Sequence, residues 1–179
     1  MIVAISGLSG CGKNTVGEKT ASMLGLKPIR MSFKDEAARR GIPLMELQAI
    51  AGSDGGALDR ELDARISAEA ARGDCVVTTW LGPWSVKNAD LRVWLNATLE
   101  ERARRVAGRD GMKPSEAKKH VRARDRDNVV RYKKYYGIDI RDHSMFDLEI
   151  NTNRFGPDQS AVMIAKAAEL VGARKFEMG

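Results

Sequence analysis

A glycine-rich loop that ends in a lysine lies close to the start of the printed sequence, after an apolar run rich in β-branched residues. From Gly7 to Lys13 the spacing is G-x-x-x-x-G-K, which turns the backbone tightly and directs several N–H groups toward one anion. Lys13 adds a positive charge for the β- and γ-phosphates of a nucleotide, and the helix expected after the loop adds the partial charge of its N-terminus. The pattern predicts that nucleotide phosphates bind at Gly7, Leu8, Ser9, Gly10, Cys11, Gly12, Lys13, Asn14 and Thr15.

One position departs from the usual form of this loop. The residue after the lysine is commonly Ser or Thr, whose hydroxyl binds Mg²⁺, but this chain has Asn14 there and Thr15 next. Mg²⁺ keeps several of its waters and is held largely by the phosphates themselves, so the missing hydroxyl does not exclude the metal. We therefore predict Mg²⁺ as a cofactor, with Thr15 as the protein group closest to it.

Positive charge is concentrated between residues 102 and 134. This segment holds thirteen Lys and Arg and four Asp and Glu, a local balance of +9 in a chain whose net charge is +6. Phosphoryl transfer mainly requires charge neutralisation and alignment, so arginines that close over the phosphates are expected to carry the rate. Arg124 and Arg131 are seven residues apart and project from one face of a helix. The alternative for this segment is an exposed ladder of ion pairs.

Length and composition indicate one globular domain. The chain has 179 residues and no apolar run that approaches the roughly 18 residues of a membrane span. The N-terminus enters a strand directly and shows no basic, apolar leader. Cys11 lies in the phosphate loop and Cys75 opens an apolar strand, so we expect no disulfide, no zinc site and a reducing cytoplasm.

Apolar runs and helical patterns alternate along the chain, which predicts an α/β fold with a parallel sheet. Gly25 and Gly137 are typical of helix ends, and Thr98 with Glu101 forms the pattern of a capping box. The expected strands are 2–6, 28–31, 75–79, 91–95 and 146–150. The expected helices are 15–24, 34–40, 43–51, 57–72, one that follows Thr98, then 115–136 and 157–171, with a break at 108–114.

A second group of candidates follows the second and third strands, at the edge where open α/β sheets bind ligands. Asp59 and Asp63 lie one turn apart on the helix 57–72. The alternatives are that they read a base amino group, that they position an arginine, or that at least one of them faces solvent, and the last is the commoner outcome for such residues. Trp80 and Trp84 flank a Gly-Pro pair, where they either stack on a base or pack in the core. The candidates for binding the second substrate are Ser32, Lys34, Arg39, Asp59, Asp63 and Trp80.

The phosphate loop near the start, the short α/β chain and the basic helical segment before the last strand are together the layout of nucleoside monophosphate kinases. GKNT resembles the GKGT form of their loop, in which the position after lysine is often neither Ser nor Thr. The stretches ALDRELDARI, NADLRVWLNATLEERARRVAGRDG, RYKKYYGIDI and FDLEINT resemble archaeal-type cytidylate kinases over nearly the whole chain. Residues 131–139 are the most specific part of this resemblance.

The resemblance implies a fold and a reaction. The fold is of the P-loop NTPase type, a parallel five-stranded sheet with helices on both faces, acceptor-binding helices at about 32–72 and a helical lid at about 108–134. The reaction moves the γ-phosphate of ATP, with Mg²⁺, onto CMP or dCMP and yields ADP and CDP or dCDP. We expect a monomer whose partners are small nucleotides, with neither nucleic acid nor membrane. The catalytic residues implied are Lys13, Arg109, Arg124 and Arg131, with Arg105 a further candidate.

Two departures from the family pattern lie on the acceptor side. The segment 31–36 lacks the usual Gly-Asp-x-Phe/Leu-Arg form, and 78–80 is Thr-Thr-Trp where Glu-Gly-Arg is common, so an arginine for the acceptor phosphate is missing there. The alternatives therefore include another acceptor, such as UMP, AMP or a dephospho-coenzyme-A-like substrate. An ATP-dependent RNA- or ribosome-associated factor that uses the basic segment to bind nucleic acid is a further alternative.

Overall fold

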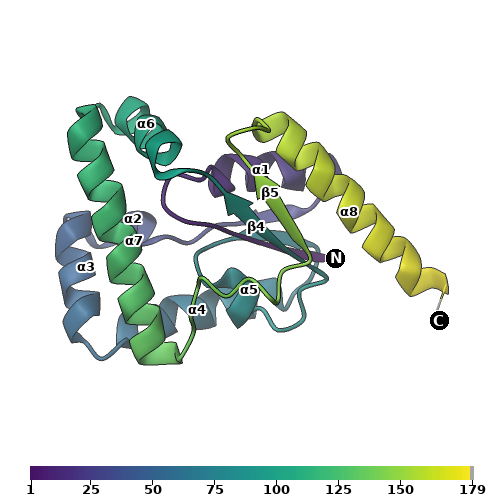
Figure 1. Ribbon diagram of the computed structural model, residues 1–179. Coiled ribbons are helices and arrows are strands. Elements are labelled where there is room, and N and C mark those ends of the chain that lie inside the picture. The colour runs from purple at the N-terminus through teal and green to yellow at the C-terminus, as the bar shows by residue number, and fades with distance from the viewer. Residues whose placement is uncertain (178–179) are drawn as a thin grey trace.

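Five parallel strands form the centre of the protein (Figure 1). The structure is a computed structural model that describes residues 1–177, and the side chains of Lys34 and of residues 174–177 fall outside that description. The strand order is β2-β3-β1-β4-β5, so the chain passes to one side of β1 and then to the other. The strands are β1 (Ile2–Ser6), β2 (Lys27–Ile29), β3 (Cys75–Thr78), β4 (Leu91–Asn96) and β5 (Leu148–Asn151).

Helices cover both faces of this sheet, as the sequence predicted. Two differences from the expected elements are a short helix at α5, for which no helix was expected, and a last helix that continues six residues further. The helices are α1 (Lys13–Leu24), α2 (Phe33–Arg40), α3 (Leu44–Ser53), α4 (Ala57–Ala70), α5 (Gly82–Ser85), α6 (Leu99–Asp110), α7 (Pro114–Tyr136) and α8 (Pro157–Glu177). None of the helices in the described part of the chain is long and apolar enough to cross a membrane.

The central strand β1 is buried on both faces because its residues alternate between two apolar layers. Val3 and Ile5 pack with Val16 of α1 and Ile164 of α8 on one face. Ile2 packs with residues of α4 and of the segment after α5 on the other face. A strand buried on both faces is held rigidly. The position of the first residue of the loop after β1 is therefore fixed as well.

Helices α6 and α7 pack on each other and stand beside the carboxyl ends of the strands (Figure 1). The break between them is shorter than predicted, because Gly108 lies inside α6 and the helix ends at Gly111, which has φ 65°. The C-terminal half of α7 is part of the protein body, since Tyr135 Oη donates to the carbonyl of Gly52 at 3.1 Å and Tyr132 is buried. The segment expected to form a lid is therefore attached to the protein body through the C-terminal half of α7.

The start of α6 also differs from the capping box that the sequence suggests. The Thr98 hydroxyl accepts from the Glu101 N–H at 3.3 Å, which is the expected half of the box. The other half is made by Asn153, whose side-chain oxygen accepts from the Thr98 N–H at 3.1 Å. The Glu101 carboxylate is free to bind Arg104 and Arg105 instead. The cap thus connects α6 to the segment after β5.

Candidate functional site

A cavity of about 710 Å³ opens at the carboxyl ends of the strands, beside the point where the strand order turns around β1. Open α/β sheets bind their ligands at this place, and the volume lies within the range of about 300–1,000 Å³ that holds small molecules. Its lining comes from the phosphate loop, α2, α4, the end of β3, α6, α7 and the segment after β5. The cavity therefore joins the two groups of residues that the sequence separated, the loop with its basic segment and the acceptor candidates.

The shape of the phosphate loop depends on two glycines at positions where a Cβ atom would clash with the backbone of another segment. A Cβ at Gly7, where φ is 152°, would lie 2.5 Å from the carbonyl oxygen of Leu95. A Cβ at Gly10, where φ is 81°, would lie 2.7 Å from the carbonyl oxygen of Arg102. These close approaches leave the loop packed against β4 and α6, with Ser9 through Val16 lining the cavity. Gly7 and Leu8 do not contribute to that lining and lie at the base of the loop.

Lys13 is the first residue of α1 and its side chain folds back over the loop. Its Nζ donates to the carbonyl of Gly7 at 3.1 Å and lies 5.1 Å from the centre of the Trp80 ring. Burial lowers the pKa of Lys13 from its ordinary value. A partly desolvated ammonium group at the mouth of an anion cradle gains more from a phosphate than a solvated one does.

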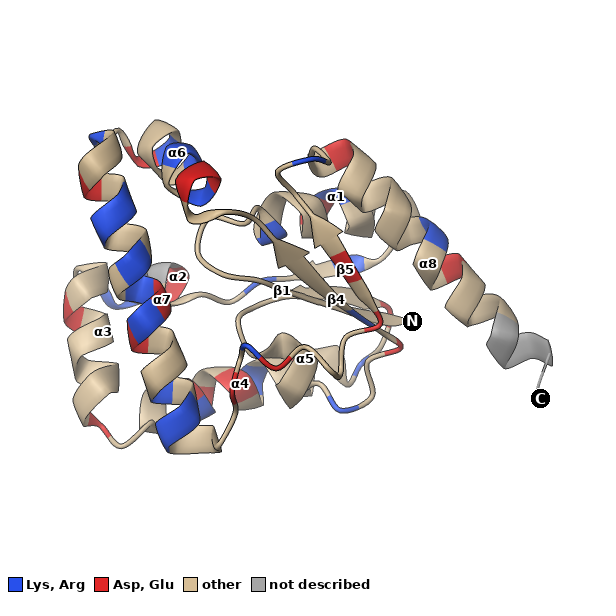
Figure 2. Ribbon diagram, in the orientation of Figure 1, with Lys and Arg blue, Asp and Glu red and all other residues tan. Residues whose placement is uncertain are grey.

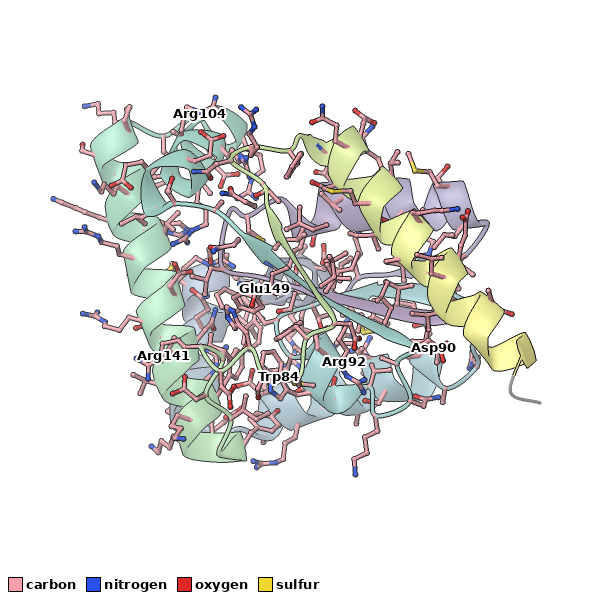
Figure 3. The ribbon with its side chains drawn as sticks, turned by 45° about the vertical axis from the view of Figure 1, so that its right-hand side comes forward. Trp84, Asp90, Arg92, Arg104, Arg141 and Glu149 are labelled. Carbon is pink, nitrogen blue, oxygen red and sulfur yellow. The ribbon has the colours of Figure 1, made fainter. Side chains whose placement is uncertain are left out.

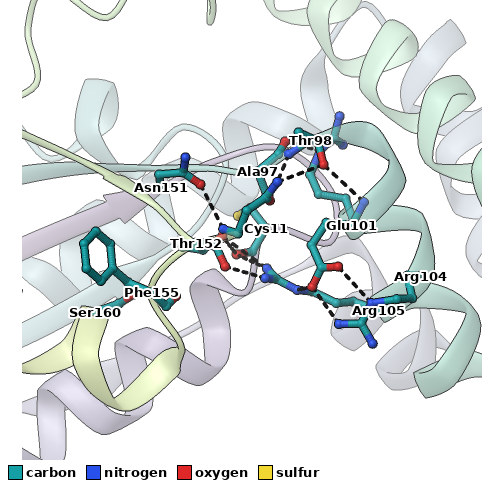
Figure 4. A network of polar contacts seen from close by, with 12 residues as sticks. Cys11, Ala97, Thr98, Glu101, Arg104, Arg105, Asn151, Thr152, Phe155 and Ser160 are labelled. Atoms are coloured by element: carbon teal, nitrogen blue, oxygen red, sulfur yellow. Dashed lines mark hydrogen bonds and ion pairs between the residues drawn. The ribbon is translucent and has the colours of Figure 1, made fainter.

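Two elements hold the carbonyl of Cys11, and Figure 4 shows the network. Arg105 Nη1 donates to this carbonyl at 3.1 Å, and the Thr152 hydroxyl donates to it at 2.9 Å. Arg105 also donates to Thr152 and is paired with Glu101 at 2.9 Å. The sequence offered Arg105 as a candidate for the phosphates, but the structure uses its guanidinium to orient the loop backbone, with Thr152 of the segment after β5 as its partner.

The carbonyl and the N–H of Ser9 are held by a buried ion pair between α6 and α7. Arg102 Nη1 donates to the Ser9 carbonyl at 3.0 Å, Asp125 Oδ1 accepts from the Ser9 N–H at 3.1 Å, and the two side chains meet at 2.5 Å. Sequence reasoning did not find this pair, because Arg102 and Asp125 are two charged residues among many in the basic segment. The separation of 116 residues between Ser9 and Asp125 leaves no local signal.

The predicted catalytic arginines take three different environments. Arg124 lines the cavity, and its Nε atom is buried without a hydrogen-bond partner. Burial, with Arg109 nearby, lowers the pKa of Arg124. Arg109 lines the cavity rim, is half exposed and binds Asp110. Arg131 is buried and does not contribute to the lining, because its Nε lies 2.7 Å from Asp59 Oδ2. Figure 2 shows further basic residues along α7.

Two carboxylates of α4 line the cavity, whereas the sequence favoured a solvent-facing position for at least one of them. Asp59 is buried in its pair with Arg131, and Asp63 Oδ2 accepts from the Tyr136 hydroxyl at 2.6 Å. Burial is the main cause that raises the pKa of Asp63 to about 6, while the tyrosine bond acts in the opposite direction. The acceptor half of the cavity therefore carries one carboxylate with a fixed cation and one that titrates within the physiological range.

The remaining acceptor candidates are divided between the cavity and the surface. Ser32 lines the cavity, but its hydroxyl binds Asp35 in the cap of α2. Trp80 lines the cavity and packs on Tyr132, with ring centres 6.2 Å apart. Arg39 is exposed and paired with Glu36, outside the cavity, and the Lys34 side chain lies outside the described residues. Trp84, a residue of α5, makes an edge-to-face contact with Phe146. Figure 3 shows that it lies away from Arg104 of α6.

A metal ion bound beside the phosphate loop would have few ligands from the described residues. Among the described residues no three His, Cys, Asp or Glu side chains gather where they would hold a metal ion. Asn14 and Thr15 are exposed and line the cavity beside Lys13. A cation there would be held chiefly by the phosphates and water, which is the usual arrangement for Mg²⁺.

Comparison with known families and proteins gives one consistent result. The model of the cytidylate kinase-like family matches residues 2–154. The cytidylate kinase of Pyrococcus horikoshii is 39% identical over 94% of this chain and 88% of its own length. The cytidylate kinase of Halobacterium salinarum is 36% identical over 99% of this chain and 94% of its own length.

Solved structures show the same fold at low sequence identity. The shikimate kinase of Acinetobacter baumannii, solved with shikimate, superimposes with a TM-score of 0.61 at 19% identity, over 97% of this chain and 94% of that one. The deoxyadenosine kinase of M. mycoides superimposes with a TM-score of 0.58 at 12% identity, over 94% of this chain and 99% of that one. The predicted P-loop kinase fold is thereby confirmed.

Proposed function

The chain belongs to the cytidylate kinase-like family, and from that premise we propose that it transfers the γ-phosphate of ATP to CMP or dCMP, giving ADP and CDP or dCDP. The observation that carries the proposal is one continuous cavity. The phosphate loop lines one end of it, and residues of α2 and α4 line another part. A cavity that reaches from the donor loop to a separate acceptor region fits direct transfer between two bound nucleotides.

On the donor side, the chain supplies positive charge and N–H groups to the triphosphate. The loop backbone from Ser9 to Thr15, the N-terminus of α1 and the Lys13 ammonium face the cavity together. Mg²⁺, when bound, neutralises the phosphates and aligns them, and Thr15 is the residue proposed to lie closest to it. Arg124 and Arg109 are the arginines placed to stabilise charge on the transferring group.

On the acceptor side, we propose that Asp63 and Trp80 contact the pyrimidine. The cytosine edge carries an exocyclic amino group that donates hydrogen bonds, and the Asp63 carboxylate is an acceptor on the cavity wall. Trp80 offers a ring face at the end of β3, where the family pattern has a different sequence. Arg131 acts through its pair with Asp59, which holds the carboxylate of α4 against α7. Arg131 is therefore proposed as a positioning residue, while Arg124 contacts phosphate.

The chain is further proposed to act as a monomer in a reducing compartment such as the cytoplasm. The cavity lining of one chain already includes both the phosphate loop and the proposed acceptor region, so the proposed reaction needs no residue from a second copy. Cys11 and Cys75 are both free and buried, so neither depends on an oxidising environment.

Release of ADP, measured in a coupled assay with each nucleoside monophosphate in turn, tests the proposal. We expect CMP and dCMP to give the highest kcat/KM, with turnover that requires ATP and Mg²⁺. A different monophosphate with kcat/KM at least about tenfold above CMP, about 1.4 kcal/mol in transition-state binding, contradicts the substrate assignment. ADP release stimulated by RNA and indifferent to every monophosphate supports the RNA-factor alternative instead.

A further inference from the structure

One buried ion pair, between Arg102 and Asp125, forms hydrogen bonds with the backbone of the phosphate loop at Ser9. The Ser9 N–H donates to Asp125 Oδ1 at 3.1 Å and the Ser9 carbonyl accepts from Arg102 Nη1 at 3.0 Å, while Arg102 Nη1 lies 2.5 Å from Asp125 Oδ2. The exposed fractions are 7% for the Arg102 side chain and 14% for that of Asp125. Both polar groups of one loop residue are thus committed to side chains from α6 and α7.

We propose that Arg102 and Asp125 are positioning residues. They fix the phosphate loop and Arg124 in a reactive geometry before nucleotides bind. The inference rests on the proposed function, because it assigns these residues a part in phosphoryl transfer. It adds two residues that contact neither the phosphates nor the acceptor and that act through Ser9 and Arg124.

The first part of the argument concerns the direction of the loop amides. A trans peptide directs its carbonyl oxygen and the following N–H to opposite sides. Arg102 holds the Ser9 carbonyl, so the N–H of Gly10 points away from Arg102. Arg102 is itself fixed, because its Nε donates to the Ala97 carbonyl at 3.1 Å and its own carbonyl lies against Gly10. The ion pair therefore selects the orientation of the peptide between Ser9 and Gly10.

The second part concerns α7, which carries Arg124. Neighbouring residues of a helix point about 100° apart, so α7 directs Asp125 to the loop and Arg124 to the cavity at the same time. The bond from Asp125 to Ser9 fixes both the rotation of α7 and its distance from the loop. The Nε atom of Arg124 is buried without a hydrogen-bond partner of its own, so the place of Arg124 depends on the position of α7.

A carboxylate is required at this position because two donors approach it. One oxygen accepts from a backbone N–H and the other from a guanidinium. An asparagine has nearly the same shape but one acceptor oxygen, so it serves Ser9 or Arg102 and not both. Asp125→Asn thus breaks one of these two contacts with little change in volume.

The matched control is Asp127 on the same helix, which is exposed and lies 3.8 Å from Arg126. We expect Asp125→Ala to lower kcat about 100-fold, the loss that a displacement of about 1 Å causes at a reacting centre. Asp125→Asn should lower kcat about tenfold, and the KM for CMP should change less than about threefold in both variants, because the ion pair does not touch the acceptor pocket. Asp127→Ala should stay within about twofold of the wild type.

A double variant separates positioning from a loss of stability. If Asp125 acts through Arg124, the kcat of Arg124→Ala combined with Asp125→Ala should equal that of Arg124→Ala within about threefold. Independent effects that multiply would contradict this part of the proposal. The melting temperature of each variant shows that the measured fraction is folded, and if Asp125→Ala does not fold, Asp125→Asn decides.

Hydrogen exchange tests the contact between Asp125 and Ser9 without any activity assay. In the ligand-free wild type the Ser9 N–H should exchange slowly, and Asp125→Asn should speed its exchange more than Asp127→Ala does. Rapid exchange of Ser9 in the wild type overturns the proposal, as does an Asp125→Asn variant with kcat within about twofold of the wild type. A wild type that phosphorylates no monophosphate refutes the proposed function instead, and the exchange result still stands as a separate finding about the loop.

Discussion

The donor and acceptor sides of the cavity are built from different parts of the chain. On the donor side the backbone forms the binding surface, and the side chains of Arg102, Arg105 and Thr152 hold its carbonyls by hydrogen bonds. On the acceptor side the binding surface consists of side chains, with Asp59 and Asp63 of α4 held by partners on α7. A triphosphate is the same in every nucleotide, so a rigid backbone cradle suits it, whereas a base must be distinguished by side chains.

The largest expected effect comes from removing the charge at the centre of the donor side. Lys13→Met should leave the fold intact and lower kcat by about 1,000-fold, because an electrostatic contact to the transferring phosphate contributes several kcal/mol. Circular dichroism and ADP release measured on the same sample check this prediction. Turnover within about tenfold of the wild type would remove the basis for the kinase assignment.

The next effect compares two arginines of α7 that the sequence treats alike. Arg124→Ala should lower kcat about 100-fold and leave the melting temperature unchanged or higher, because it removes a desolvated cation whose Nε has no partner. Arg131→Ala should cost about 3–5 kcal/mol of stability, because it leaves Asp59 buried and unpaired. Thermal unfolding and kcat measured for both variants test this contrast, and equal losses of stability would contradict it.

The acceptor side should show a pH dependence of stability that comes from Asp63. Asp63 has a folded-state pKa of about 6 against 3.8 for the free group, so the folded state binds the proton more tightly. The stabilisation this provides is complete below pH about 4 and is lost as the pH rises through about 6. Asp63→Asn should therefore gain stability relative to the wild type between pH 4 and pH 6, by a few kcal/mol at most. Denaturant unfolding at several pH values measures the difference.

The Tyr136 hydroxyl provides a sharper version of the same experiment. Its hydrogen bond lowers the pKa of Asp63, so Tyr136→Phe should move the Asp63 titration to higher pH. If ionised Asp63 binds the cytosine amino group, the KM for CMP should then rise on the acidic side at a higher pH than in the wild type. A titration that stays in place, or moves down, contradicts the assigned contact.

The smallest expected effect concerns motion of the basic segment. The family resemblance implies a helical lid at about 108–134, but the structure attaches α7 to the loop at Asp125 and to α3 at Tyr135. A bisubstrate analogue should therefore slow hydrogen exchange mainly around the α6–α7 turn, near Gly111, and change it little beyond Asn128. Uniform slowing along all of α7 supports the larger moving lid that the sequence suggested.

The amino-acid sequence by itself determined the fold class and the donor site. Alternating apolar runs predicted the five strands, and all five occur in one parallel sheet with helices on both faces. The G-x-x-x-x-G-K spacing located the phosphate loop because its requirements are local: left-handed backbone at Gly10 and Gly12, and a helix that begins at Lys13. Local backbone geometry depends on residues that are neighbours in the chain, so a single sequence is sufficient to predict it.

Only the tertiary structure decided which charged residues do which work. Arg124 and Arg131 are both arginines on the same predicted helix face. In the structure Arg124 lines the cavity, whereas Arg131 is buried against Asp59. Asp125 and Asp127 are equally plain in the sequence, but only Asp125 meets the loop. These differences arise from contacts between residues far apart in the chain. The rotation of α7 is set by its contacts with the phosphate loop, α3, α4 and α6 rather than by any local pattern.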